Sequence, residues 1–531
     1  MKILVSDPVS QAGIEVLQKH FPVDVKLKLP AEELAAIIGE YDALVVRSET
    51  KVTKEIIAKA DKLKVIGRAG VGVDNIDVEA ATNRGIIVLN APEGNTIAAT
   101  EHTVAMLLAM ARQIPQAYQS MKQGKWERSK FMGVELRGKT LGIIGLGRIG
   151  TGVAQRALAM EMKIIAYDPF LSAERAASLG ITLMEVKDVI AQADFITLHS
   201  PLTKETKNLL DKEAFETMKP SVRIVNCARG GIINEQALFE ALVSGKVAAA
   251  AVDVFEKEPL PADSPLASAP NLIITPHLGA STQEAQINVA VDVAEGVITA
   301  LRGEPVRTAV NIAPVSAEAM SFVRPYLTLA EKLGHLAANL VKGRIQKVEM
   351  TYQGEVGKRE FHPITTAAIK GLLGPILLET INYVNAPAIA KARGIKVAET
   401  VNQEEENFTN FITMRVISDK GEVTISGALF GKIEPRIVEI NGYHVDAIPT
   451  GYVLVSPHMD TPGIIGQVGT ILGANKINIA GMQVGRKLGQ QPGGESIMVL
   501  AIDAPAEQEV IDLIKTVKGI TDVTLVNFSG K

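Results

Sequence analysis

The chain has 531 residues, of which 47% are hydrophobic, and a formal net charge of −4. This length exceeds a domain of about 100 to 200 residues and predicts several domains, while the acidic balance gives no bulk attraction to nucleic acid or anionic membranes. Cys227 is the single cysteine, which excludes an intramolecular disulfide framework and a cysteine cluster for a metal. Residues 1–8 resemble a first strand and not a signal peptide, and apolar runs such as 104–111 are too short for a bilayer. We therefore expect a cytoplasmic protein without a metal, a membrane or a nucleic acid as partner.

Short apolar strands alternate with helical segments in the first 95 residues, which predicts a parallel α/β sheet. A long helical stretch over 97–121 leads into a second α/β unit that ends near residue 275. Ser281, with Glu284 three residues on, forms a capping box that opens another long helix over 281–301, which returns to the first unit. Two lobes joined by crossing helices leave a cleft for a small substrate beside a dinucleotide.

The pattern changes after a proline-bearing linker at Pro314. The next stretch contains one helical segment, over 326–341, strands over 347–352 and 411–418, and no catalytic cluster. From Tyr452 the order of elements is strand, helix, two strands, helix and strand, a compact βαββαβ unit. The predicted domains are a substrate-binding domain of residues 1–97 and 285–312, a dinucleotide-binding domain of 98–284, an intervening domain of 315–448 and a regulatory domain of 452–531.

A glycine turn follows the predicted strand 140–144. Gly145 permits the tight turn, Gly147 lets the backbone approach a pyrophosphate, and Gly150 lets helix and strand pack closely. The next strand ends in Asp168, where a carboxylate can bind both ribose hydroxyls and repel a 2′-phosphate. The sequence therefore predicts that the cofactor is NAD rather than NADP.

Arg229, Glu258 and His277 follow predicted strands of the dinucleotide half, whose carboxyl ends open on the ligand crevice. Taken singly, Arg229 is equally consistent with a surface salt bridge, Glu258 with a solvated loop charge and His277 with a turn cap. Together they suit hydride transfer involving a 2-hydroxy acid. His277 would take the hydroxyl proton, Glu258 would orient it and stabilise its charge, and Arg229 would hold the substrate carboxylate and carbonyl.

Residues 145–150 with Asp168, and the segments 226–231, 253–259 and 276–280, resemble the D-isomer-specific 2-hydroxyacid dehydrogenase family, in which a matching Arg, Glu and His are catalytic. Residues 46–48, 67–75, 125–128 and the C-terminal extension are similar to its long-form members that act on 3-phospho-D-glycerate. The resemblance implies an α/β fold of two Rossmann-like parallel-sheet lobes with a cleft, an α+β intervening domain and a C-terminal ACT domain.

The same resemblance carries over the ligand sites residue by residue. The implied substrate site comprises Arg47, Ser48, Gly70, Val71, Gly72 and Asn95, with Arg68 and Arg128 as further phosphate candidates that suit a surface charge equally well. The implied cofactor site adds Arg148, Ile149, Ser200, Cys227, Ala228, Asp253, Gly279 and Ala280 to Gly145, Gly147, Gly150, Asp168, Arg229 and His277. Arginines and glycine-rich backbone donors suit a substrate with a carboxylate at one end and a phosphate at the other.

In the C-terminal unit, His458, Asp460 and Asn478 resemble the ACT turn and strand that bind an amino acid, here L-serine. Asp460 stands where some members have Asn, although a carboxylate can also receive the serine ammonium. The alternative is an ACT domain that serves assembly alone. A site between two chains requires an oligomer, so a homodimer or homotetramer is expected.

The resemblance implies NAD-dependent oxidation of 3-phospho-D-glycerate to 3-phosphohydroxypyruvate, the first step of phosphorylated serine synthesis, with serine as feedback inhibitor. One alternative is a broader D-2-hydroxyacid dehydrogenase or hydroxypyruvate reductase. A second is an NAD-sensing scaffold protein, which a turnover assay distinguishes from an enzyme.

Overall fold

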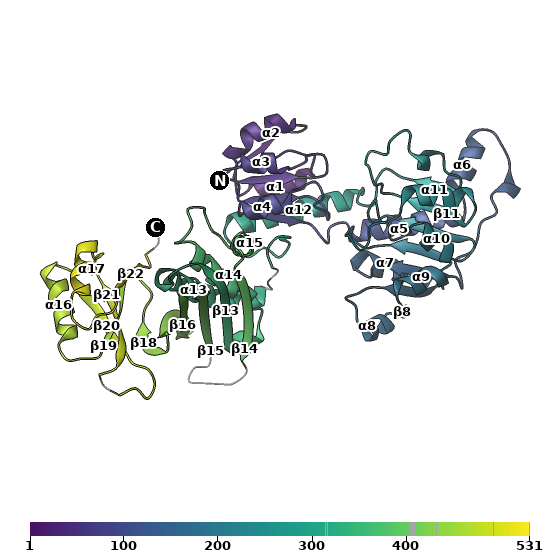
Figure 1. Ribbon diagram of the computed structural model, residues 1–531. Helices are drawn as coiled ribbons and strands as arrows, with labels where there is room; N and C mark the ends of the chain where they lie inside the picture. Colours follow the sequence, from purple (N-terminus) through teal and green to yellow (C-terminus); the bar gives the residue numbers. More distant parts are fainter. Residues whose placement is uncertain (314, 316, 403–409, 432, 492, 530–531) are drawn as a thin grey trace.

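The computed structural model describes residues 1–313, 315, 317–402, 410–431, 433–491 and 493–529. The described residues form four sheets, each at the centre of one structural unit. In Figure 1 the N-terminal unit (purple) lies between the blue and teal unit on the right and the green and yellow units on the left. We call the four units the first lobe, the second lobe, the third unit and the fourth unit, in chain order. None of the described helices is long and apolar enough to cross a membrane. The predicted α/β fold class is confirmed.

The first lobe is a parallel sheet of order β2-β1-β3-β4-β5. Its strands β1, β3 and β4 are almost wholly buried, as expected for a parallel sheet covered on both faces. The elements are β1 Ile3–Val5, α1 Gln11–Gln18, β2 Val23–Val25, α2 Ala31–Ile37, β3 Ala43–Val46, α3 Lys54–Ala58, β4 Val65–Arg68, α4 Val78–Asn83 and β5 Ile87–Asn90. Helix α12, Gln283–Leu301, returns to this lobe and packs against α1 and β4.

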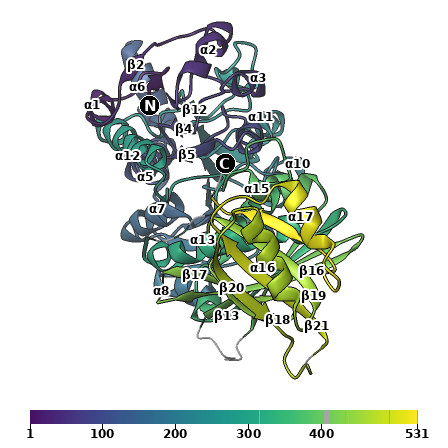
Figure 2. The same ribbon diagram turned by 90° about the vertical axis from the view of Figure 1, so that its left-hand side faces the viewer.

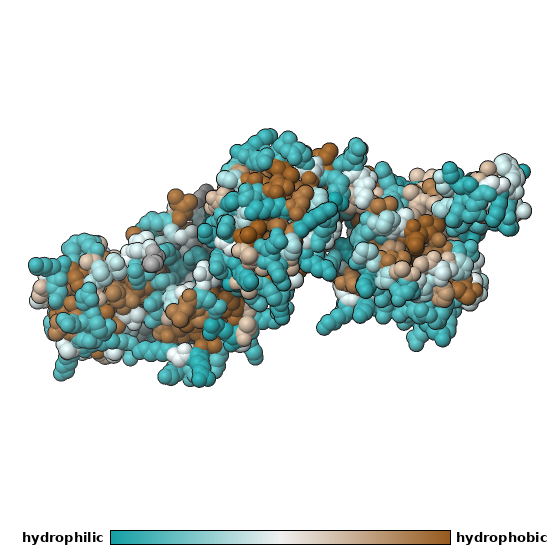
Figure 3. Space-filling view, turned by 90° about the horizontal axis from the view of Figure 1, so that it is seen from above, coloured by the Kyte–Doolittle hydropathy of each residue, from teal (hydrophilic) through white to brown (hydrophobic). Residues whose placement is uncertain are grey.

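The second lobe is a parallel sheet of order β12-β11-β10-β9-β6-β7-β8. It holds α5 Thr96–Ala111, α6 Ile114–Lys122, β6 Thr140–Ile144, α7 Arg148–Ala159, β7 Lys163–Tyr167, α8 Ala173–Ser178, β8 Ile181–Leu183, α9 Val186–Gln192, β9 Phe195–Leu198, α10 Lys212–Thr217, β10 Val222–Asn226, α11 Glu235–Val243, β11 Val247–Val252 and β12 Leu272–Ile274. The strand order reverses between β6 and β9, which is where such sheets bind ligands. Figure 3 shows a notch between the two lobes.

The third unit is a mixed sheet of order β14-β13-β15-β16-β17-β18, with α13 and α14 packed together against it. It comprises α13 Ala317–Leu340, β13 Ile345–Gly354, α14 His362–Leu373, α15 Ala386–Ala392, β14 Lys396–Asn402, β15 Asn410–Ser418, β16 Gly421–Phe430, β17 Glu434–Ile440 and β18 Tyr443–Ala447. The fourth unit, which faces the viewer in Figure 2, has an antiparallel sheet of order β20-β21-β19-β22. It contains β19 Tyr452–Met459, α16 Ile464–Ala474, β20 Ile479–Gly485, β21 Glu495–Ile502, α17 Gln508–Lys515 and β22 Thr524–Asn527.

Three sequence predictions of elements are wrong. The stretch 97–121 is two helices, because Gln113 takes a left-handed φ of 52° and Pro115 lacks an N–H at the start of α6. The cap of α12 is Thr282, whose hydroxyl accepts from the backbone N–H of Ala285 at 3.1 Å, and not Ser281. The third unit has three helices among its described residues instead of one, and the first of them runs through Pro325.

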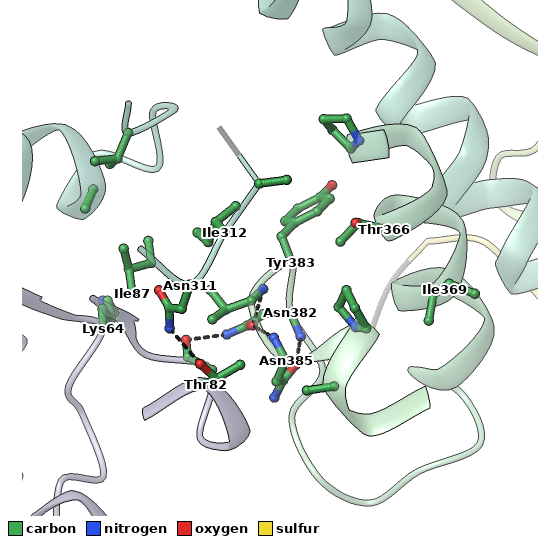
Figure 4. A pocket seen from close by; sticks show the side chains of 18 of the residues that line it. Lys64, Thr82, Ile87, Asn311, Ile312, Thr366, Ile369, Asn382, Tyr383 and Asn385 are labelled. Atoms are coloured by element: carbon green, nitrogen blue, oxygen red, sulfur yellow. Dashed lines mark hydrogen bonds between the residues drawn. The ribbon is translucent and has the colours of Figure 1, made fainter. Parts of the chain in front are cut away.

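A seam joins the first lobe to the third unit. The Asn382 side chain of the third unit donates to Gly85 O of the first lobe at 2.8 Å (Figure 4). Beside it, within the first lobe, the Asn311 side chain donates to Thr82 Oγ1 at 3.0 Å and to Ile86 O at 2.9 Å. A cavity of about 1920 Å³ opens along this seam, with Tyr383 and Thr366 on the wall formed by the third unit. It lies away from the carboxyl ends of the two parallel sheets. The third unit is thus anchored to the turn that precedes β5.

Candidate active site

The glycine turn after β6 leads directly into α7. Gly145 has a φ of 97°, and a Cβ there would lie 2.7 Å from the backbone of His199 at the end of the neighbouring strand. A Cβ on Gly150 would collide with the carbonyl oxygen of Gly145. Gly147 is the N-cap of α7, and no atom lies within 4 Å of where its Cβ would stand. The turn therefore leaves open space at a helix N-terminus, which suits a pyrophosphate.

Asp168 follows β7 and lies beside this turn. Its Oδ2 accepts from Leu146 N at 2.7 Å, and its Oδ1 accepts from Phe170 N at 2.9 Å and Leu171 N at 3.1 Å. These backbone donors hold the carboxylate at the glycine turn, and lone pairs remain on both oxygens for ribose hydroxyls.

Two further cofactor candidates lie at the same end of the sheet. The Ser200 hydroxyl is buried without a hydrogen-bond partner among the described residues, so it has unused capacity for a ligand. Arg148, the first residue of α7, forms an ion pair of 2.8 Å with Glu93 of the first lobe. An unpaired hydroxyl, an open glycine turn and a guanidinium fit the donor set that a dinucleotide needs.

His277 and Glu258 form a hydrogen-bonded pair. The His277 Nδ1 lies 2.8 Å from Glu258 Oε2, while Glu258 Oε1 accepts from Phe255 N at 3.1 Å. Burial acts to raise the pKa of the Glu258 carboxyl, but the hydrogen bond and charge of His277 outweigh it and the pKa is lowered. The imidazole is half exposed, so its Nε2 is free to face a substrate.

Asp253, at the end of β11, is fully buried and holds the loop that carries His277. Its Oδ1 accepts from Leu278 N at 2.7 Å and from the Thr275 hydroxyl at 2.6 Å, and its Oδ2 accepts from Gly279 N at 2.9 Å. Because these donors surround the carboxylate, it fixes the conformation of residues 275–280. We call this segment the catalytic loop.

Arg229 reaches from the second lobe toward the first. Its Nη1 donates to Ala228 O at 2.7 Å, and its Nε lies 3.4 Å from Asp74 Oδ2. A Cβ on Gly72 would run into this guanidinium, so Arg229 lies directly over the glycine-rich loop after β4. Cys227 lies nearby, and burial with the charge of Asp253 raises the pKa of its thiol to about 12, which rules out a thiolate nucleophile at neutral pH.

The first lobe adds two more arginines. Arg68 is half-buried, its Nε has no hydrogen-bond partner among the described residues, and its guanidinium lies against Gly70. Burial and the nearby charges of Arg229 and Arg47 lower the pKa of Arg68 to about 10. The Arg47 backbone N–H donates to Asp7 Oδ2 at 2.6 Å, which fixes the turn holding Arg47 and Ser48. Asn95, the N-cap of α5, has a buried Oδ1 without a partner in the described part of the chain.

The structure therefore brings the three predicted catalytic residues and the substrate arginines to the facing ends of the two sheets. Sequence reasoning missed His102, Asp74 and Glu93, which contact Asp253, Arg229 and Arg148 respectively. Only the position of His102 within the predicted helix 97–121 offered a signal, because seven residues from Asn95 make two helical turns.

The predicted serine-site residues lie at opposite ends of the sheet of the fourth unit. His458 and Asp460 are at the end of β19, whereas Asn478 precedes β20, which begins at the end of the sheet where β19 begins. His458 is buried, and its Nδ1 lies 3.2 Å from Ser456 O. Asp460 Oδ2 pairs with Arg486 Nη2 at 2.7 Å, and the Asn478 side chain donates to Asp503 Oδ2 at 2.8 Å. The three side chains thus bind separate partners within the chain.

Comparisons with known proteins agree with this architecture. Residues 104–279 match the NAD-binding domain of the D-isomer specific 2-hydroxyacid dehydrogenases, residues 322–441 the intervening domain of D-3-phosphoglycerate dehydrogenase and residues 453–519 the ACT domain. The chain is 49% identical to D-3-phosphoglycerate dehydrogenase of Archaeoglobus fulgidus, over 99% of this chain and 100% of that one. It is 46% identical to the protein of that name from Bacillus subtilis, over 99% of both chains.

Solved structures resemble the two lobes. D-lactate dehydrogenase from Escherichia coli superposes with a TM-score of 0.52 and 28% identity, covering 58% of this chain and all of that one. D-lactate dehydrogenase from Aquifex aeolicus, solved with NAD and lactic acid, gives a TM-score of 0.51 and 27% identity over 57% of this chain and 96% of that one. The chain therefore belongs to the D-3-phosphoglycerate dehydrogenase family, NAD-dependent oxidoreductases of the D-isomer specific 2-hydroxyacid dehydrogenase type.

Proposed function

We propose that this chain oxidises 3-phospho-D-glycerate to 3-phosphohydroxypyruvate with NAD, the first step of phosphorylated L-serine biosynthesis. The observation that carries the proposal is the hydrogen-bonded pair of His277 and Glu258 at the same cleft as Arg229 and Arg68. An imidazole braced by a carboxylate is a proton acceptor, and the arginines provide the positive charge that a doubly anionic substrate needs.

Each residue of this set has a defined role in the reaction. NAD, when bound, accepts the hydride that leaves C2 of the substrate. His277 takes the hydroxyl proton on Nε2, while Glu258 at Nδ1 orients the ring and stabilises the imidazolium. Arg229 binds the substrate carboxylate and polarises the C2 oxygen, because its donors are paired and its charge is permanent. In the reverse direction the imidazolium returns the proton.

The remaining predicted residues complete the two ligand sites. The proposed substrate residues Arg47, Ser48, Gly70, Val71, Gly72 and Asn95 belong to the first lobe or to the start of α5. The proposed cofactor residues Ile149, Cys227, Ala228, Asp253, Gly279 and Ala280 line the carboxyl ends of β6, β10, β11 and β12 in the second lobe. Asp253 is fully buried, so we propose that it serves the nicotinamide pocket mainly by holding the catalytic loop.

The deciding experiment is NADH formation from 3-phospho-D-glycerate by the purified chain. Turnover on this substrate, well above that on D-lactate or D-glycerate, supports the proposal. Equal turnover on hydroxy acids with and without phosphate identifies a broader D-2-hydroxyacid dehydrogenase or hydroxypyruvate reductase. NAD binding without turnover on any hydroxy acid identifies a scaffold protein and contradicts the proposal.

Arg47 is expected to determine the preference for phosphorylated substrates. Arg47→Ala removes a guanidinium at one charged end of the substrate, so kcat/KM for 3-phospho-D-glycerate should fall by about 10- to 100-fold, the worth of a charged hydrogen bond. The kcat/KM for D-glycerate should change less than about threefold. Lys51→Ala, an exposed cation four residues on, is the control. Equal losses on both substrates would show that Arg47 does not bind the phosphate.

Asp168 is expected to exclude NADP. Replacing the carboxylate in Asp168→Ser removes a charge that repels a 2′-phosphate and a ligand for the ribose hydroxyls. We expect the ratio of kcat/KM for NAD to that for NADP to fall by at least about tenfold, measured in steady-state assays with each cofactor. An unchanged ratio would show that the cofactor ribose does not bind at Asp168.

We propose L-serine as a feedback inhibitor bound at the fourth unit, at a site between two chains, by residues around His458, Asp460 and Asn478. The ACT match over residues 453–519 supports an amino-acid ligand. Asp460→Ala removes the proposed acceptor for the serine ammonium and should raise the serine concentration for half-inhibition by at least about tenfold. Asp512→Ala, on the exposed face of α17, is the control. If serine does not inhibit the unmodified enzyme, the proposed serine site is wrong and the fourth unit serves assembly alone.

Assembly into a homodimer or homotetramer in the cytoplasm completes the proposal. It is supported by an apolar arm that projects from the second lobe at α6 (Figure 1), where Ile114, Tyr118, Met121, Trp126 and Met132 are all more than half exposed. Such a patch marks a protein interface. Sedimentation of the purified chain tests this, and a monomer at micromolar concentration would contradict it.

A further inference from the structure

His102 lies in the second turn of α5, the helix that begins beside the first lobe and packs against α7, β10, β11 and β12 of the second. Its side chain is largely buried. The Nε2 atom lies 3.3 Å from Asp253 Oδ1 and 3.4 Å from the Thr275 hydroxyl. With the ring assigned as the Nε2–H tautomer, it donates toward the carboxylate that fixes the catalytic loop.

The same helix begins at a proposed substrate residue. Asn95 is the N-cap of α5, and its Oδ1 is buried with no partner among residues the structure describes. His102 follows seven residues later, two turns along, so both side chains lie on one face of the helix. A rigid helix therefore carries a substrate contact at its start and a contact with the anchor of the catalytic loop further along.

We propose that His102 is a positioning residue that ties the catalytic loop to α5 through Asp253, so that His277 and Asn95 are held in one frame. The connection runs from His102 to Asp253, and from Asp253 to the backbone N–H groups of Leu278 and Gly279 beside His277. The inference rests on the proposed role of His277 as the proton acceptor. His102 itself touches neither proton nor hydride.

Asp253 depends on its donors because it is wholly buried. Burial acts to raise the pKa of this carboxyl, but hydrogen bonds from His102, Thr275 and Leu278 outweigh it and the pKa is lowered. The other titratable groups that face it are Cys227, whose sulfur lies within 4.8 Å of its carboxylate oxygen, and Glu258, whose charge interacts with it. Neither donates to Asp253, so loss of the His102 donor must raise the pKa of Asp253.

The pH dependence of the enzyme should reflect the ionisation of Asp253. A carboxylate with a depressed pKa stabilises the loop at higher pH, and this stabilisation is lost as the pH falls through that pKa. If the pKa rises, the loss begins at a higher pH. Removing the His102 donor should therefore move the acid limb of the kcat profile upward in pH.

The experiment compares His102→Phe, which keeps a ring without a donor, with His102→Gln, whose amide retains a donor. We expect His102→Phe to lower kcat by about 10- to 100-fold, the usual effect of a misplaced reacting group, with KM for the substrate changed less than about threefold. The acid limb of its kcat profile should shift to higher pH. His102→Gln should restore both kcat and the position of the acid limb to near those of the unmodified enzyme. Glu101→Ala, one residue earlier in α5, is the control, because Glu101 is exposed and faces Arg156 instead of Asp253.

Thermal melting and NADH binding, followed by fluorescence, verify that each variant is folded and binds cofactor. His102→Phe with unmodified kcat and acid limb would overturn the inference. A loss of kcat in His102→Phe that His102→Gln does not rescue would also overturn it, because ring packing alone would then explain the loss. His277→Ala distinguishes the two levels of failure. If His277→Ala retains full turnover, the proposed function fails, whereas if only the His102 variants behave as unmodified enzyme, this inference fails alone.

Discussion

Replacing His277 by alanine should lower kcat by a factor of about 10² to 10⁴, the usual worth of a positioned acid or base. The reason is that Glu258 would then face an empty position, and no other imidazole in the described chain is hydrogen-bonded to it. The affinity for NAD should stay nearly unchanged, since the glycine turn and Asp168 lie at the other end of the cofactor site.

The measurement is steady-state NADH formation together with NAD binding by fluorescence. His20→Ala, which changes a histidine paired with Arg302 on the outside of the first lobe, is the matched control and should turn over normally. Turnover of His277→Ala equal to that of the unmodified enzyme would remove His277 from the mechanism.

Replacing Arg229 by alanine should reduce kcat/KM by a similar factor. A guanidinium that donates two charge-assisted bonds to a carboxylate contributes about 1.5 to 3 kcal/mol for each bond, which together correspond to about 10² to 10⁴ in kcat/KM. The loss should appear in both kcat and KM, because the same group binds the substrate carboxylate and polarises the oxygen at C2.

Arg229→Lys is the informative companion variant, because it keeps the charge but lacks the planar pair of donors. It should recover only part of the loss in kcat/KM. Full recovery would mean that charge alone is needed at this position. Stopped-flow measurement of NADH release, with and without deuterium at C2 of the substrate, would show whether hydride transfer has become the slow step.

The seam between the first lobe and the third unit is connected to the glycine-rich loop after β4. Asn382 contacts the turn at Gly85, directly before β5, and β5 ends at Asn90, whose side chain donates to Val71 O in the glycine-rich substrate loop at 2.5 Å. One strand therefore connects the seam to this loop.

Sequence patterns determined the chemistry of this protein. Buried apolar runs predicted the parallel strands, and the spacing of Gly145, Gly147 and Gly150 with Asp168 predicted the dinucleotide turn, because local backbone geometry demands those residue types. Arg229, Glu258 and His277 were predicted from their places in the chain, since each follows a strand whose carboxyl end opens on the cleft. These features depend on short stretches of chain, which a sequence displays directly.

Only the tertiary structure decided which groups surround those residues. The pairing of Asp253 with His102 joins positions 151 residues apart, and the contact of Arg229 with Asp74 joins two lobes, so no periodicity reveals either. Of the mixed sheet of the third unit, β13 and β15 were predicted, and their residues alternate regularly in burial. Strands β14 and β16, which do not alternate regularly, were missed. Long-range contacts gain their stability from burial and from the satisfaction of polar groups, and these are properties of the folded chain as a whole.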